Sequence, residues 1–226
     1  MVQLEQSYID REGYEMQKVT GWRWTFFIGG LIVMSLGITM SIKGKIVGTS
    51  PWDVLHVGLF QNFGLSIGTW SILTGLFIVA STSIVLRQWP KIGTWLNMLL
   101  IGLFIDVFNW LLPSTNIYSL QVTYFVIGLF VLSFGCGMYI APNMGAGPRD
   151  TLMMILVEKF GGTIKTARMG IEVLVTIFGW LLGGPVGVGT VVIALTSGYI
   201  VQYSLPYCQK LLMKCIGNIE DMKPFY

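Results

Sequence analysis

Residues 24–42 read WTFFIGGLIVMSLGITMSI and decide the class of fold, because this long apolar stretch contains no Asp, Glu, Lys or Arg. As an α-helix, roughly 20 apolar residues cross the ~30 Å hydrocarbon core of a bilayer. Further stretches without a charged residue lie at residues 92–105, 107–148 and 173–209. Together they predict an all-α, polytopic membrane protein with about six spans, in contact with the lipid bilayer.

The composition excludes an ordinary soluble enzyme. Of the 226 residues, 54% are hydrophobic and 11% are charged, whereas soluble domains carry about 25% charged residues. The net charge of +3 comes from basic residues beside the spans, so we expect no nucleic-acid partner. The sequence contains no phosphate loop, nucleotide fingerprint, Ser nucleophile elbow or His/Cys metal cluster, and we expect no enzymatic activity, cofactor or metal site.

The two halves of the chain resemble each other. Alignment of Phe27 with Phe125 superimposes glycines throughout the first span, and it places the motif GTSPWD, residues 48–53, on GAGPRD, residues 145–150. Each half then has a long span, a Gly/Pro break, a short helix and two more spans. The predicted organisation is a cytoplasmic tail at 1–21, membrane repeats at 22–112 and 120–206, and an interfacial C-terminal helix and tail at 207–226.

The two short helices set the topology. Residues 148–160 carry charges at both ends, so their uncharged centre reaches only ~10 Å at 1.5 Å per residue, and the matching residues 51–63 are also polar. We interpret both as re-entrant or interfacial, so each half crosses three times and the repeats are inverted. With the N-terminus cytoplasmic, only Lys43 and Lys45 then face outward, as the positive-inside rule favours. In the alternative, both short helices span, the halves are parallel, and three further basic residues also lie outside.

The paired Gly-x-x-Pro-x-Asp turns are the most specific candidate site. Proline suits the first position of a helix, and an Asp two residues later favours the positive end of the helix dipole, so Ser50 with Asp53 resembles a capping box. Breaks at matching positions of a repeat also mark binding sites in secondary transporters. We therefore expect the two turns to face each other across a pseudo-two-fold axis and to line a substrate or ion pathway. The candidate residues are Pro51, Asp53, Pro148, Arg149 and Asp150.

Three polar residues inside the spans complete the candidate pathway. Asp106 has no basic neighbour in sequence, and its repeat mate is Gln202, so the pair indicates either an ion or proton relay or an interhelical hydrogen bond. Glu172 lies four residues after Arg168, which favours an ion pair at the cytoplasmic end of the span. The only histidine, His56, can titrate near neutral pH, although a lone histidine more often forms a structural hydrogen bond.

The GTSPWD and GAGPRD motifs, together with Ser66-Ile67-Gly68-Thr69, resemble the YczE/YyaS/YitT family of bacterial inner-membrane proteins over residues 22–205. The resemblance implies a multi-pass protein of the bacterial plasma membrane and lends no catalytic residues. Our leading hypothesis is a transporter of a small molecule or ion, with its site between the repeats. The alternative is a non-transporting accessory or regulatory protein that docks another membrane protein or a second copy of itself.

Overall fold

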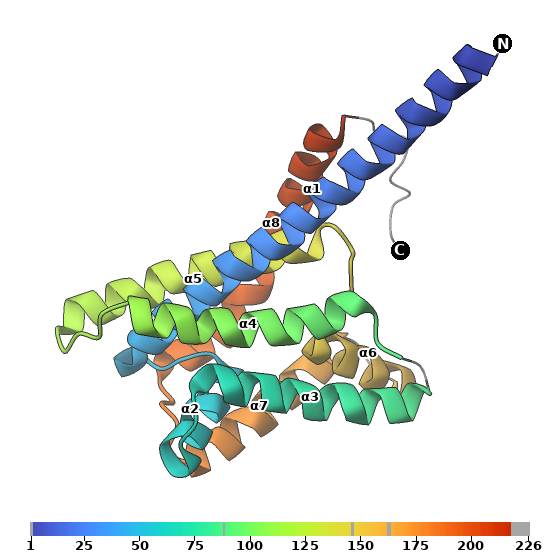
Figure 1. The fold of residues 1–226 in the computed structure, drawn as a ribbon. Coiled ribbons are helices and arrows are strands. Elements are labelled where there is room, and N and C mark those ends of the chain that lie inside the picture. Colours follow the sequence, from blue (N-terminus) through green and yellow to red (C-terminus); the bar gives the residue numbers. More distant parts are fainter. Residues whose placement is uncertain (1, 88, 146, 162–163, 218–226) are drawn as a thin grey trace.

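The chain folds into a bundle of helices (Figure 1), seen in a computed structural model that describes residues 2–87, 89–145, 147–161 and 164–217. The described residues contain no strand, which confirms the all-α class. The helices are α1 Val2–Lys43, α2 Pro51–Phe63, α3 Ile67–Leu86, α4 Ile92–Leu111, α5 Tyr118–Ile140, α6 Pro148–Phe160, α7 Ile164–Leu181 and α8 Val188–Ile216, with one 3-10 turn, η1, at Lys45–Val47.

Five helices in the described part of the chain are long and apolar enough to cross a membrane: α3, α4, α5, α8 and the segment Val19–Lys43 of α1. The sixth predicted span is α7, whose 18 residues include Lys165, Arg168 and Glu172. These charges make α7 less apolar than a typical span. The all-helical membrane architecture is therefore confirmed, whereas the count of six spans stays a prediction.

The antiparallel pair α1 and α5 forms the most extensive helix–helix contact among the described residues (Figure 1). Glycines bring the two backbones together. A Cβ atom added at Gly30 would lie 2.3 Å from the backbone nitrogen of Tyr139, and one added at Gly37 would lie 2.2 Å from that of Leu132. Small residues at such a seam let transmembrane helices approach closely. The seam joins the first helix of one half to the first helix of the other.

Each short helix makes its main contact with the opposite half of the chain. The helix α2 packs chiefly against α7, and α6 chiefly against α3, while α4 lies beside α1 and α8 beside α5. Both halves have the same order of one long helix, one short helix and two longer ones, and the two short helices lie in different parts of the bundle (Figure 1). The inverted repeat stays a prediction. We call the packing of each short helix against the other half of the chain the exchange of short helices.

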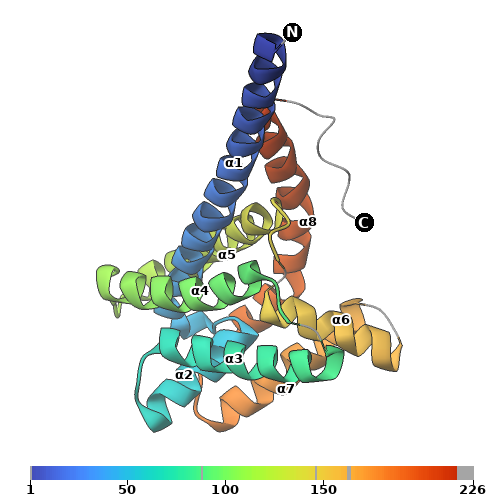
Figure 2. The ribbon, with the colours of Figure 1, turned by 45° about the vertical axis from the view of Figure 1, so that its right-hand side comes forward.

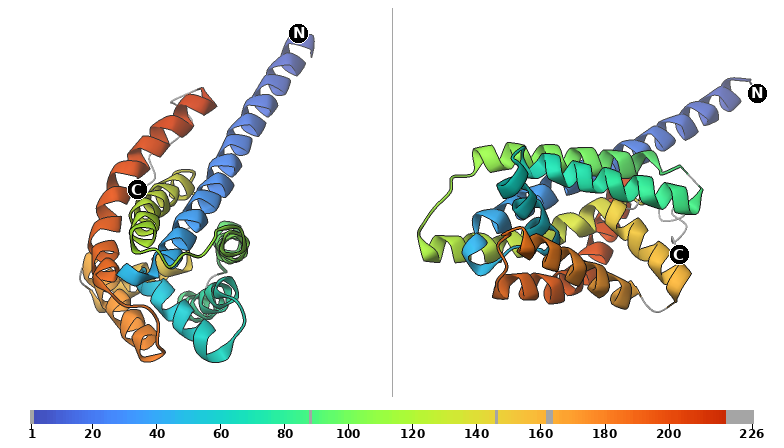
Figure 3. Two further views of the ribbon diagram at one scale, coloured as in Figure 1. Left: turned by 90° about the vertical axis from the view of Figure 1, so that its left-hand side faces the viewer. Right: turned by 90° about the horizontal axis from the view of Figure 1, so that it is seen from below.

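The helix α8 extends past the predicted end of the second repeat. It continues through Pro206 to Ile216, and Cys208, Leu212 and Ile216 are buried against Phe26 of α1. Figure 2 and the left view of Figure 3 show the ends of α1 and α8 projecting together from the bundle. Residues 207–216 therefore prolong α8. The sequence had instead suggested a separate interfacial helix there.

Two basic residues of α1 hold the ends of neighbouring helices. Lys43 Nζ donates hydrogen bonds of 3.0 Å to the carbonyl oxygen of Asn109 and to Oγ of Ser114, so α1 and α4 end at the same side of the bundle. Arg23, far from this end of α1, donates at 2.8 Å to the carbonyl oxygen of Pro142, which follows α5. These contacts fix which loops share a membrane side.

Single cysteines introduced as Lys43→Cys and Ser114→Cys are expected to react from the same side of the membrane, the outside, because the two native side chains touch. The start of α3, Ile67, lies near Lys43, and Arg87 follows the other end of α3. Arg87→Cys is therefore expected to react only from the cytoplasmic side. The measurement is labelling of intact cells with an impermeant maleimide, after the native cysteines Cys136, Cys208 and Cys215 have been replaced by serine. External labelling of Arg87→Cys would support the parallel arrangement of the halves.

Candidate functional site

The break before α2 is built by Gly48 and Pro51. Gly48 has a φ of 107°, a left-handed conformation that favours glycine, and a Cβ atom there would lie 2.6 Å from Oγ1 of Thr190 on α8. Pro51 is the first residue of α2. Ser50 occupies the N-cap position, but its side chain makes no capping hydrogen bond, and its hydroxyl donates to Oδ2 of Asp53 at 2.6 Å. The capping box predicted from Ser50 and Asp53 is therefore wrong.

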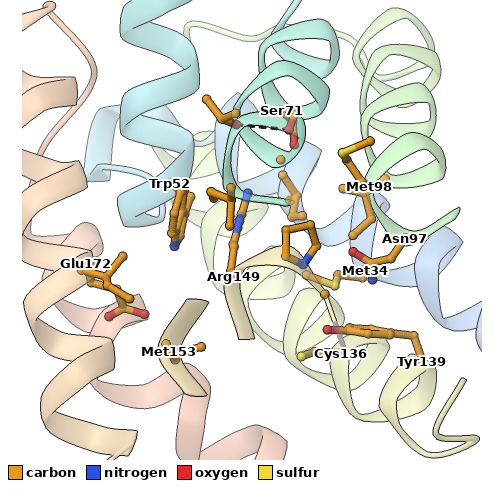
Figure 4. A pocket seen from close by; sticks show the side chains of 18 of the residues that line it. Met34, Trp52, Ser71, Asn97, Met98, Cys136, Tyr139, Arg149, Met153 and Glu172 are labelled. Atoms are coloured by element: carbon orange, nitrogen blue, oxygen red, sulfur yellow. Dashed lines mark hydrogen bonds between the residues drawn. The ribbon is translucent and has the colours of Figure 1, made fainter. Parts of the chain in front are cut away.

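The starts of α2 and α6 meet. The guanidinium carbon of Arg149 lies 4.6 Å from the ring centroid of Trp52, which is a cation–π contact, and Figure 4 shows the two side chains next to each other. Pro148 begins α6 directly before Arg149. The side chain of Asp150 lies outside the described residues, so the expected approach of Asp53 to Asp150 stays a prediction.

A cavity of about 140 Å³ opens at this meeting point. Residues of α1, α3 and α4 line it from the first half and residues of α5, α6 and α7 from the second, with Trp52 of α2 beside them (Figure 4). Asn97 of α4 also lines it, is 3% exposed, and has an Nδ2 group without a hydrogen-bond partner. A buried amide donor without a partner costs about 1–3 kcal/mol.

Two buried titratable side chains, Asp53 and His56, lie beside the cavity. They are 1% and 0% exposed. Nδ1 of His56 lies 3.8 Å from Oδ1 of Asp53, which is too far for a hydrogen bond, and neither atom has another partner. Nε2 of His56 lies 2.9 Å from Oγ1 of Thr74, a residue of α3 that lines the cavity. The three-residue spacing of Asp53 and His56, which places both on one helix face, is the sequence signal for this pair.

Glu172 forms the ion pair that its spacing from Arg168 predicts. Its Oε1 lies 2.8 Å from Nε of Arg168, and both residues line the cavity. The pair therefore brings two opposite charges to the wall and no net charge. Glu172 and Pro51 also border a separate groove between α7 and α8, so Pro51 and Pro148 face different hollows of the protein.

Asp106 and Gln202 are not among the residues that line the cavity. Asp106 accepts a hydrogen bond of 2.8 Å from the backbone N–H of Gly68 and a second one from the hydroxyl of Ser66. It therefore caps the start of α3 from the neighbouring helix α4. Gln202 is exposed on α8. Of the two interpretations of Asp106, the contacts support the interhelical hydrogen bond.

A second cavity, of about 270 Å³, lies at the Lys43 end of the bundle. It meets α1 at Ile42 and α3 at Ile67, whereas the first cavity meets the same two helices at Ile38 and Ser71. Four residues of a helix rise about 6 Å. Only a thin layer of protein therefore separates the two cavities along these helices.

The helix α2 also borders both cavities, at successive positions along its length. Trp52 lines the first cavity, and Val57 lines the second. Asp53 and His56 lie between these two positions in the helix and are fully enclosed. The buried pair therefore belongs to the layer that separates the cavities.

The sequence matches the model of a family of unknown function, DUF6198, over residues 21–206. The chain belongs to the DUF6198 family. It is 46% identical over 196 residues to the uncharacterized membrane protein YczE of Bacillus subtilis, which covers 87% of this chain and 91% of YczE. An uncharacterized protein of Haemophilus influenzae is 33% identical over 186 residues, covering 80% and 84% of the two chains. No solved structure matches.

The DUF6198 match includes both short helices and all residues that line the first cavity, and it ends at Pro206 within α8. A further similar protein is YyaS of Bacillus subtilis, 27% identical over 184 residues, which cover 80% of this chain and 91% of YyaS. The resemblance inferred from the GTSPWD and GAGPRD motifs is thus confirmed. The description of YczE as a membrane protein agrees with the long apolar helices of this chain.

Proposed function

We propose that this protein moves a small solute across the bacterial plasma membrane, with its N-terminus in the cytoplasm and its binding site in the cavity between the two halves. The observation that carries the proposal is the alignment of two cavities on α1 and α3 with one helical turn between them. Transporters built from repeats bind their substrates between the halves and open to one side at a time. The proposal assigns binding and passage to the cavity, and no chemical reaction.

The size of the first cavity limits the solute. At about 140 Å³ it is close to the ~150 Å³ cavity that holds one benzene molecule in an engineered protein. A solute of this class has few non-hydrogen atoms. The cavity therefore suits a small metabolite and excludes a lipid or a peptide.

The lining favours a solute with an acceptor-rich end and an apolar end. Arg149 and the start of α6, at Gly147 and Pro148, lie on one side, and a helix N-terminus favours negative charge. The unpaired Nδ2 of Asn97 adds a donor. The remaining wall is largely apolar, with Met34, Ile38, Met98, Ile101 and Ile171. A small carboxylate with an apolar tail matches both ends.

Small carboxylates are expected to raise the unfolding temperature of the purified protein in nanodiscs. A ligand at 100 times its Kd stabilises the folded state by about 2.7 kcal/mol, which corresponds to about 5–11 °C for a chain of this size. The measurement compares propionate and benzoate with propionamide, propylamine and benzyl alcohol at equal concentration and ionic strength. Only the acids should stabilise the protein.

The variant Asn97→Leu is expected to reduce this stabilisation, because it removes the donor from the cavity wall while it leaves no partner unpaired. Gln202→Leu, an exposed position on α8, serves as the matched control and should respond like the native protein. If no class of solute shifts the unfolding temperature, or if Asn97→Leu responds unchanged, the cavity is not the binding site that we propose.

A docking function is the second candidate, because α7 and α8 do not pack along each other as α3 and α4 do. A groove of about 280 Å³ lies between them, with Val173, Ile177, Val191 and Leu195 on its walls. These four side chains are all exposed. A photo-crosslinker at Leu195 that captures a second copy or another membrane protein, together with no effect of any solute, would favour docking over transport.

A further inference from the structure

The hydrogen bonds around His56 favour one of its two neutral tautomers. The hydroxyl of Thr74 donates to the carbonyl oxygen of Trp70 at 2.9 Å or to that of Ser71 at 3.1 Å, since a carbonyl oxygen only accepts. We assign the proton to Nε2 of His56, 2.9 Å from Oγ1 of Thr74, because in this tautomer Oγ1 accepts from His56 while the Thr74 hydroxyl keeps its bond to one of these carbonyl oxygens. In the neutral imidazole Nδ1 is then a bare acceptor.

This bare nitrogen faces a second acceptor. Oδ1 of Asp53 lies 3.8 Å from Nδ1, both atoms are buried, and neither has a partner, while Oδ2 of Asp53 already accepts from Ser50. Two buried acceptors that face each other gain nothing from their contact. One proton between them turns the pair into an imidazolium–carboxylate hydrogen bond, for which the usual N–O distance is about 2.7–2.9 Å.

We infer that Asp53 and His56 form a proton-binding site in the layer between the two cavities. The proton binds to Nδ1 of His56, no covalent bond other than N–H forms or breaks, and the carboxylate of Asp53 accepts the new hydrogen bond. As the pair tightens from 3.8 Å, the hydrogen bond that joins Nε2 of His56 to Thr74 transmits the change to the cavity wall.

The charges around the pair link proton binding to the solute. The neighbouring helix α3 has no charged residue, and α7 contributes the Arg168–Glu172 ion pair. Burial lowers the pKa of His56, Asp53 raises it, and the Arg149 cation of α6 lowers it. The side chains of Asp150 and Lys165 lie outside the described residues. An anion beside Arg149 offsets its repulsion of the proton, so proton and anion each favour the binding of the other. This coupling rests on the transport function proposed above.

The test uses the fact that His56 is the only histidine. Protein labelled with ¹⁵N-histidine and held in nanodiscs gives the signals of a single imidazole, which are followed by NMR as the pH falls. We expect the Nε2-protonated neutral form at high pH and protonation of Nδ1 at low pH. In Asp53→Asn the protonation midpoint should move to lower pH, because the carboxylate that favours the imidazolium is lost. Asp106→Asn, the same change in α4 beside the start of α3, is the control and should leave the midpoint in place.

Several outcomes would overturn the inference. A neutral imidazole protonated on Nδ1, or a midpoint unchanged in Asp53→Asn, would remove the proton site. A response of the Nδ1 signal to sodium chloride but not to choline chloride, at constant pH, would assign the space to a metal cation instead. Should Asp53→Asn fail to fold, Thr74→Val replaces it: loss of the acceptor for Nε2 should allow the other tautomer to appear, and an unchanged tautomer would contradict the hydrogen bonding on which the inference rests.

This titration contains no solute, so its result is independent of the carboxylate panel. A proton site without any stabilising carboxylate would leave the inference standing and would end the proposed function. Stabilisation by carboxylates without a titrating pair would do the reverse. If both hold, the stabilisation by propionate should increase as the pH falls through the midpoint of His56.

Discussion

Gly30→Ala is expected to abolish the accumulation of folded protein, whereas Gly29→Ala, one residue earlier, is expected to be tolerated. A Cβ atom at position 30 would lie 2.3 Å from the backbone nitrogen and 2.7 Å from Cα of Tyr139. Carbon atoms in contact lie about 3.5–4.0 Å apart, so α1 and α5 would have to separate by about 1 Å. Overpacking costs about 1–3 kcal/mol where side chains can move, and here the obstacle is backbone on both sides.

Gly29→Ala is the matched control, because Gly29 lies in the same helical turn as Gly30 but faces a different neighbour. A Cβ atom at Gly29 meets only Cε of Met138, at 3.1 Å, and the flexible end of a methionine side chain can move aside. The measurement is the monodisperse fraction of a fluorescent fusion on size-exclusion chromatography after extraction in mild detergent. Equal yields for the two variants would mean that the seam between α1 and α5 is looser than these distances indicate.

Asp106→Ala is expected to lower the stability of the protein by about 2–3 kcal/mol, or about 4–12 °C in unfolding temperature. The variant leaves the backbone N–H of Gly68 and the hydroxyl of Ser66 without the carboxylate that both contact. These groups lie at the first turn of α3, where backbone N–H groups have no partner within the helix. Asp106→Asn keeps one acceptor oxygen and should lose less.

The control for Asp106 is Gln202, the residue that the predicted repeat pairs with it in sequence. Gln202 is exposed on α8, and Gln202→Ala should leave the unfolding temperature within about 2 °C, since surface substitutions stay within about 0.5 kcal/mol. The measurement is thermal unfolding of the purified variants in one detergent. A native unfolding temperature for Asp106→Ala, combined with a loss of solute response, would instead restore the relay interpretation of Asp106.

Much of the architecture could be predicted from the sequence because a bilayer imposes a simple rule. Uncharged apolar stretches must be helices, and their length decides whether they cross. The same rule explains why the sequence alone does not establish α7 as a span, since its first turns carry Arg168 and Glu172. In sequence these charges look like the edge of a span, whereas in space they form an ion pair at the wall of a cavity.

The candidate site was predictable only in part, because it depends on which helices meet. The motifs located the two breaks, and the contact between Trp52 and Arg149 shows that the breaks come together. The interhelical hydrogen bond of Asp106 was one of two interpretations, but its partner was not predictable, since the backbone N–H of Gly68 is a group that no side-chain pattern reveals. Thr74 also lacked a signal. The polarity of Asn97 and Thr74 matters only because seven separate helices enclose the space that they face.

The exchange of short helices has a consequence for how the protein is made. The ribosome delivers α1 to α4 first, and at that stage the main partner of α2, the helix α7, has not been synthesised. The polar face of α2 must then be held at the membrane, by water, lipid headgroups or the insertion machinery, until the second half arrives. Neither half alone contains the main packing partner of its own short helix. Biogenesis of this protein is therefore complete only after translation of almost the whole chain.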